Sequence, residues 1–287
     1  MATISLRLQL DRFRLAFLQN DQRAMQELWK QLKGAPDSYR FPLLRSDVEE
    51  YCGRFRRARE LIQQASNMVP GTAAERRNEI SSWNAAPWSA LWEAEIGNSA
   101  RAREIAATAL PTVSDRERKL SLALAFARAG NIEQAQKMAD VLDHDSPLDT
   151  LVQNYHLPTI RAAMKLNEND PAGAISALQP SLKYELSLNF SFNSLYPAYM
   201  RGLAYLQLGD GRLAAAEFQK WVDHRGLVGM DVLGALVHLQ SARAQKMMGD
   251  EAAARTSYET FLDLWKNADS DIPIYRQAKA EYANLRK

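Results

Sequence analysis

The chain has 287 residues, of which 46% are hydrophobic and 24% charged, and its formal net charge at pH 7 is +2. This composition is that of a folded, water-soluble protein, and it excludes a long disordered or low-complexity chain. The near balance of charges argues against nucleic-acid binding, which needs an excess of positive charge on one face.

Cys52 is the only cysteine, so an intramolecular disulfide and a multi-cysteine zinc site are excluded. We interpret it as a small buried thiol. No window approaches the roughly 20 apolar residues that a membrane-spanning helix requires, and residues 1–10 show no signal-peptide pattern. We expect a soluble chain, cytoplasmic by default, or extracytoplasmic if it derives from a membrane-anchored signalling protein.

A turn signal recurs seven times along the chain, at spacings of 33 to 44 residues, and each time a helix pattern with alanine follows it. Such a period is typical of stacked helical hairpins, each too small to bury its apolar face alone. The sequence therefore predicts an all-α fold, with one continuous domain over residues 1–287. The turn signals are Asn20-Asp21, Gly53-Arg54, Gly97-Asn98, Gly130-Asn131, Asn169-Asp170, Gly209-Asp210 and Gly249-Asp250.

The repeat pattern of turn and alanine is weaker in the early hairpins. In the first, Met25 and Trp29 stand at the alanine and bulky positions, which is typical of a terminal cap. The following three place a small residue shortly after the turn, namely Ala58, Ala102 and Ala135. We expect these alanines to lie where the two helices of a hairpin cross.

The hairpin around Gly209 is the best preserved, with helices expected near 195–208 and 213–224. Gly202 and Ala214 should let these helices approach closely, while Tyr205 and Phe218 fill the space around the contact. The last hairpin repeats this pattern 40 residues later, with Ala242, Ala254 and Tyr258. A final helix is expected after Pro273, as a second cap.

The order of small residue, Tyr or Phe, Gly, Ala and Phe in these hairpins resembles the tetratricopeptide repeat (TPR), whose usual period is about 34 residues. The longer spacings here place extra residues between hairpins, for example in 225–232. The resemblance implies a right-handed superhelical solenoid of about seven TPR-like hairpins, whose first helices line a concave groove.

Two longer sequence segments make the resemblance more specific. "LDTLVQNYHLPTIRAA" (148–163) and "SYETFLDLWKNADSDIPIYRQAKAEYANL" (257–285) resemble the C-terminal TPR region of bacterial serine/threonine protein kinases and related signalling regulators. The kinase domain itself is absent, because the chain has no Gly-rich phosphate loop, no His-Arg-Asp and no Asp-Phe-Gly segment. The resemblance implies the sensory or scaffolding half of such a protein.

We expect no enzyme activity, no catalytic residues and no cofactor. Motifs of metalloproteases, serine hydrolases and dinucleotide-binding proteins are missing. The triplet Asp143-His144-Asp145 could suggest a metal site, but no second histidine follows at helical spacing, so we interpret it as a surface turn or helix cap and expect no metal.

The TPR pattern implies which residues face the groove. The predicted set is acidic in the early hairpins and basic in the last: Asp47, Glu50, Tyr51, Asn84, Glu95, Arg128, His156, Asn167, Tyr199, Gln207, Arg243 and Lys246. Such a graded surface could hold an extended peptide or a helix of opposite charge gradient. Trp83, Trp88 and Trp92 have two open interpretations, packing between hairpins or anchoring a partner.

The leading prediction is a non-catalytic protein–protein interaction or scaffolding module that binds a protein or peptide in the concave groove. The alternative is a sensory or regulatory domain of a serine/threonine kinase-type signalling protein, which binds a small ligand or self-associates as a homodimer. Nucleic acid and a membrane span are excluded from both predictions.

Overall fold

The computed structural model describes residues 6–32, 39–72, 85–187 and 192–285, and within these ranges every regular element is helical. The all-α prediction is confirmed. The helices are α1 (Leu6–Leu18), α2 (Gln22–Leu32), α3 (Arg40–Tyr51), α4 (Phe55–Met68), α6 (Ala85–Glu95), α7 (Ser99–Ala109), α8 (Arg116–Arg128), α9 (Ile132–Asp145), α10 (Leu157–Asn167), α11 (Pro171–Ala177), α12 (Tyr196–Leu208), α13 (Gly211–Asp223), α14 (Arg225–Val228), α15 (Leu233–Met247), α16 (Glu251–Leu264) and α17 (Pro273–Leu285), with short turns at Leu110–Thr112, Val152–His156 and Gln179–Tyr184.

Each of the seven turn signals joins two consecutive helices. The first residue of every signal has a left-handed backbone, with φ between 57° at Asn20 and 91° at Gly97. Glycine and asparagine are the residues that adopt this conformation most readily, so their recurrence has a steric cause. The next residue often caps the following helix, as Asp210 does by accepting a hydrogen bond from the Leu213 amide at 2.9 Å.

Small residues lie where paired helices cross. A Cβ added to Gly202 on α12 would fall 2.4 Å from Cε1 of Phe218 on α13, so only glycine allows this approach. The alanines predicted at this position after each turn are fully buried, at Ala58, Ala102, Ala135, Ala214 and Ala254. The contacts at Ala135, Ala214 and Ala254 form part of one hydrophobic core that runs through most of the described helices, whereas α1, α2 and α3 share a smaller cluster of their own.

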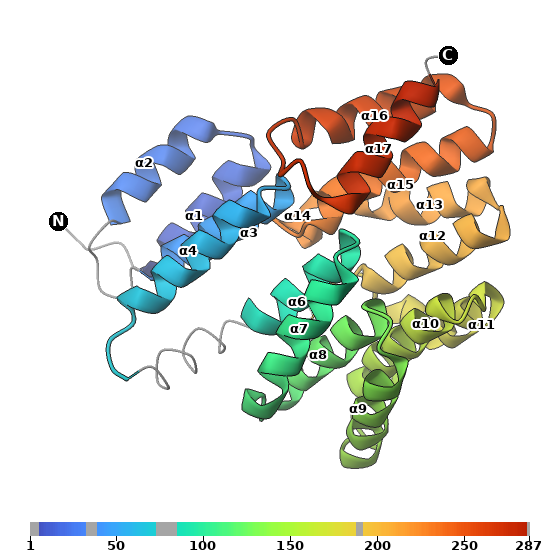
Figure 1. The fold of residues 1–287 in the computed structure, drawn as a ribbon, viewed down its shortest axis with the longest axis horizontal. Coiled ribbons are helices and arrows are strands. Elements are labelled where there is room, and N and C mark those ends of the chain that lie inside the picture. Colours follow the sequence, from blue (N-terminus) through green and yellow to red (C-terminus); the bar gives the residue numbers. More distant parts are fainter. Residues whose placement is uncertain (1–5, 33–38, 73–84, 188–191, 286–287) are drawn as a thin grey trace.

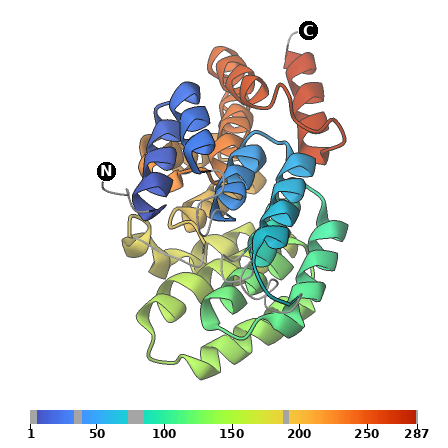
Figure 2. The same ribbon diagram turned by 90° about the vertical axis from the view of Figure 1, so that its left-hand side faces the viewer.

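The late part of the chain packs against early turns, so the arrangement of helices closes on itself (Figure 1). The Asp269 amide donates to the Gly53 carbonyl at 3.0 Å, and the Ile274 amide donates to the Ile96 carbonyl at 3.2 Å. Trp265 adds an indole hydrogen bond to the Tyr51 carbonyl at 2.9 Å. Figure 2, seen from the side, likewise places α3 and α4 beside the C-terminal helices.

This closure brings the inner sides of the first helices toward one another. α3 contacts α15, and Tyr51 of α3 lies against Gly234 of α15. No helix in the described ranges has the length and apolar character needed to cross a membrane.

Candidate functional site

The residues predicted to face one continuous groove lie in three different environments. Asp47 and Glu50 line a half-open cavity. Arg128, Asn167, Gln207 and Arg243 line a more open hollow. The other described residues of the predicted groove set line neither of these two sites. Asn84, like Trp83, falls outside the described residues. The closure of the array explains this division, because the inner wall of one hairpin is covered by another.

Glu95 is in a buried cluster rather than on a groove surface, which corrects the sequence-based prediction. Its side chain is 0% exposed, and it accepts hydrogen bonds from both Nε and Nη2 of Arg128, the latter at 2.9 Å, and from the Tyr196 hydroxyl. The three residues come from α6, α8 and α12. Burial, and after it the adjacent Glu95 charge, raises the pKa of Tyr196 well above its usual value, so the hydroxyl stays a donor.

Tyr199 and His156 are also buried, at 1% and 2% exposure, so the prediction that Tyr199 points into a groove is wrong. Tyr199 packs edge-on against Phe218 and Trp221, with ring centroids 5.9 Å apart in both pairs. His156 packs against the ring of Phe192 at 4.8 Å. Burial lowers the pKa of His156 to about 4, so this imidazole is neutral at physiological pH.

Two further residues of the predicted groove set, Tyr51 and Lys246, lie outside both sites. Tyr51 packs edge-on against Phe17 with ring centroids 5.0 Å apart, so its ring belongs to the contact between α1 and α3. Lys246 is exposed near the end of α15 and lines neither the cavity nor the hollow.

The open hollow, called the amide hollow below, has a volume of about 470 Å³ and receives polar side chains from α8, α10, α12 and α15. Two of its three amide side chains also join neighbouring helices: Asn167 donates to the Ala127 carbonyl at 2.9 Å and Gln207 to the Leu166 carbonyl at 3.4 Å. The apolar part of the lining consists of Leu166, Leu203, Leu206 and Met247.

The two arginines of the amide hollow are already paired. Arg128 binds Glu95, and Arg243 makes two hydrogen bonds to Glu281 of α17, at 2.8 and 2.9 Å. Of the predicted basic end of the groove, Arg243 is therefore neutralised by Glu281, an acid that sequence spacing could not pair with it.

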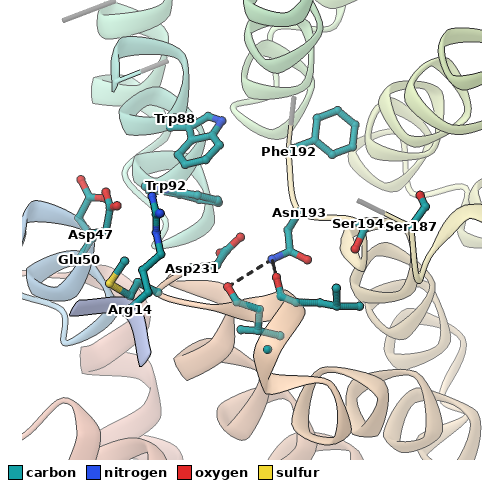
Figure 3. A pocket seen from close by; sticks show the side chains of 14 residues that line it. Arg14, Asp47, Glu50, Trp88, Trp92, Ser187, Phe192, Asn193, Ser194 and Asp231 are labelled. Atoms are coloured by element: carbon teal, nitrogen blue, oxygen red, sulfur yellow. Dashed lines mark hydrogen bonds between the residues drawn. The ribbon is translucent and has the colours of Figure 1, made fainter. Parts of the chain in front are cut away.

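The half-open cavity, called the acidic cavity below, has a volume of about 310 Å³ (Figure 3). It lies between α1, α3, α6, the segment around 192–194 and the segment 226–231. Its charged lining residues are Arg14, Asp47, Glu50 and Asp231, and its aromatic ones are Trp88, Trp92 and Phe192. The tryptophan pair thus lies on a cavity wall, with ring centroids 6.0 Å apart.

Burial raises the pKa of all three carboxyl groups in the acidic cavity. The pKa is about 7 for Asp47, where Arg14 partly opposes the shift, and about 7 for Asp231, where Glu95 and Asp47 add to it. The pKa of Glu50 lies well above its usual value, because burial and then Asp47, Glu93 and Asp231 oppose its charge, while Arg59 favours it.

These shifts affect stability in a defined direction. In the unfolded chain the two aspartates release their protons near pH 3.8, whereas in the folded protein they hold them up to about pH 7. Between these values the folded state binds more protons, so the contribution of these groups to stability falls as the pH rises. Burying these carboxyl groups in the acidic cavity therefore lowers the stability of the folded protein at neutral pH.

Arg14, Asp231 and Phe192 were missed as site residues. The sequence assigned Asp231 to extra residues between hairpins, and Arg14 to a capping helix. Arg14 reaches α3 through the packing of α1 on α3, and Asp231 reaches it through the contact between early and late hairpins. Spacing along the chain carried no signal for either contact. Asp47 and Glu50 were found through the groove-facing positions that the resemblance to the tetratricopeptide repeat implies.

Two observations concern metal ligands and the reactivity of the cysteine. No group of three or more His, Cys, Asp and Glu side chains within the described part of the chain has a metal-binding arrangement. Cys52 is half-buried, and burial raises the pKa of its thiol, which makes it less nucleophilic.

The fold and these two concave sites define an all-α protein of paired helices with polar cavities on its inner side. Comparison with known protein families finds none whose model matches the chain, and comparison with curated proteins finds no match.

Proposed function

We propose that this chain is a non-catalytic binding module that holds a protein or peptide segment in the amide hollow. The observation that carries the proposal is the hollow itself, to which four first helices each contribute a polar side chain around an apolar floor. Such a surface can hydrogen-bond a peptide backbone while burying its apolar side chains. The turn spacing supports a right-handed, TPR-like superhelix of about seven hairpins as the scaffold.

A regulatory domain of a kinase-type signalling protein is the second candidate. The acidic cavity favours it, because a half-open volume of about 310 Å³ suits a small ligand better than a peptide.

Two adjacent methionines give a matched test of the amide hollow. Met247 lines it and is 45% exposed, whereas Met248 is 46% exposed and lies outside it. We expect Met247→Glu to lower the affinity for a captured natural partner at least tenfold, because a carboxylate on the apolar floor must be desolvated on binding. Met248→Glu should leave the affinity unchanged in the same titration. Equal affinities of both variants and the wild type would reject the hollow as the binding surface.

The contact between Arg243 and Glu281 makes Arg243 unsuitable for a charge-reversal test of binding. Replacing Arg243 by an acid would place that acid beside Glu281 and lower stability, which the sequence alone did not indicate. Within the described part of the chain Lys246 has no such contact, but it lies outside the hollow, so charge reversal at Lys246 is a control that should leave binding unchanged.

A further inference from the structure

Glu50 is a buried acid that faces a cavity without a partner. It is 7% exposed and lines both the acidic cavity and a second one of about 150 Å³ beside it. Among the described residues no hydrogen bond or ion pair reaches its carboxylate. Other buried acids on the inner side are paired: Glu49 binds Arg54, Glu93 binds Arg59 and Glu95 binds Arg128.

The surrounding charges do not compensate for Glu50. Asp47 lies one helical turn before it on α3, and Asp231 adds a third carboxyl group from the segment before α15. Arg14 is the single basic residue in the described lining, and its guanidinium forms an ion pair with Asp11 at 2.9 Å. Figure 3 shows Arg14 reaching into the space between these acids. A buried carboxylate without a partner is unfavourable, so this arrangement is complementary to a cation supplied from outside.

The cavity walls add a preference for an organic cation. Trp88 and Trp92 from α6 and Phe192 provide aromatic surface around the acids (Figure 3). Aromatic faces attract ammonium and guanidinium groups and also cover the methylene groups that carry them. We propose that the acidic cavity binds a protonated amine or guanidinium on an apolar stem, with Glu50, Asp47 and Asp231 as counter-charges.

A bare metal ion fits this cavity less well. Calcium and magnesium need oxygen ligands that converge within about 2.6 Å, and no such cluster occurs within the described ranges. The cation can come from a free small molecule or from a lysine or arginine side chain of a protein. The acidic and amide sites share no lining residue, so this proposal is independent of peptide binding at the hollow.

Isothermal titration calorimetry with n-pentylammonium at about pH 8 tests the proposal, with 1-pentanol as the neutral probe of equal stem length. We expect pentylammonium to bind at least tenfold more tightly than pentanol. Its binding heat should also vary with the ionisation enthalpy of the buffer, because a bound cation drives protons off the cavity carboxyl groups. Equal affinities, or no binding of either probe, would overturn the proposal.

A capped tripeptide, acetyl-Ala-Lys-Ala-amide, distinguishes the two sources in the same titration. Binding as tight as that of pentylammonium identifies a protein side chain as the occupant. Binding of pentylammonium alone identifies a free amine.

Two neighbouring glutamates provide the matched variants. Glu50→Gln should weaken pentylammonium binding at least tenfold while raising the melting temperature at about pH 8, because folding of the wild type must either protonate the Glu50 carboxyl or bury its charge. Glu49→Gln should lower the melting temperature and leave binding unchanged, because Glu49 is paired with Arg54 and does not line the cavity. Undiminished binding to Glu50→Gln would refute the assignment.

Discussion

Replacing Arg128 by methionine is expected to lower the free energy of unfolding by about 3 to 5 kcal/mol, the usual cost of leaving a buried partner charge unpaired. Glu95 would keep the Tyr196 hydroxyl but lose both guanidinium hydrogen bonds, in a position where its side chain is 0% exposed. Urea denaturation followed by circular dichroism measures the change.

Two further variants show whether the charge pair is the cause. Arg128→Met combined with Glu95→Gln should be more stable than Arg128→Met alone, because the buried charge is gone and the amide can still accept from Tyr196. Arg57→Met removes an ion pair between exposed side chains and should change stability by less than about 0.5 kcal/mol. An Arg128→Met variant as stable as Arg57→Met would contradict the buried cluster.

Gly53→Ala is expected to cost about 2 to 5 kcal/mol, the sum of two effects. A left-handed backbone costs a residue with a Cβ about 1 to 2 kcal/mol, and a clash in a packed region adds about 1 to 3 kcal/mol. Gly53 has a φ of 74°, and an added Cβ would lie 2.7 Å from both the Ala268 Cβ and Trp265 Cδ2. The substitution therefore strains both the turn and the closure of the array.

Gly249→Ala separates these two effects. Gly249 has a φ of 79°, but nothing lies within 4 Å of an added Cβ. Only the backbone cost should appear, so this variant should retain at least about 1 kcal/mol more stability than Gly53→Ala. Equal losses in parallel denaturation experiments would show that the early turn and the C-terminal segment do not meet.

Local features of this fold could be predicted from the sequence because their causes are local. Gly209 and Asp210 specify a turn through backbone freedom and helix capping, and Gly202 specifies a close helix contact through its missing side chain. None of these signals depends on distant residues. They identify the helix pairs, which is why the all-α class and the turn positions agree with the structure.

Closure of the array could not be predicted in this way. Gly53 and Trp265 are 212 residues apart, and nothing near either one indicates the contact. The TPR pattern predicts which side of the first helix of each hairpin faces inward, and Asp47 and Glu50 do face inward. It does not indicate whether that side meets solvent or another helix, so Glu95 and Tyr199 were assigned to a groove when they are packed.

The closure also determines what kind of binding the inner side can offer. An open superhelix presents one long groove, whereas contact between early and late hairpins divides the inner wall into the acidic cavity and the amide hollow. The proposed peptide binding at the amide hollow and the proposed cation binding in the acidic cavity both depend on this division.

Amide hydrogen exchange, read residue by residue by NMR, tests the closed array most directly. Amides in the first turn of a helix have no partner within that helix and usually exchange fast. The Ile274 amide, in the first turn of α17, instead pairs with the Ile96 carbonyl, and the Asp269 amide pairs with the Gly53 carbonyl. We predict slow exchange at both positions, lost at Asp269 in Gly53→Ala. Exchange at the rate of an unstructured peptide at both amides in the wild type would contradict the closed arrangement.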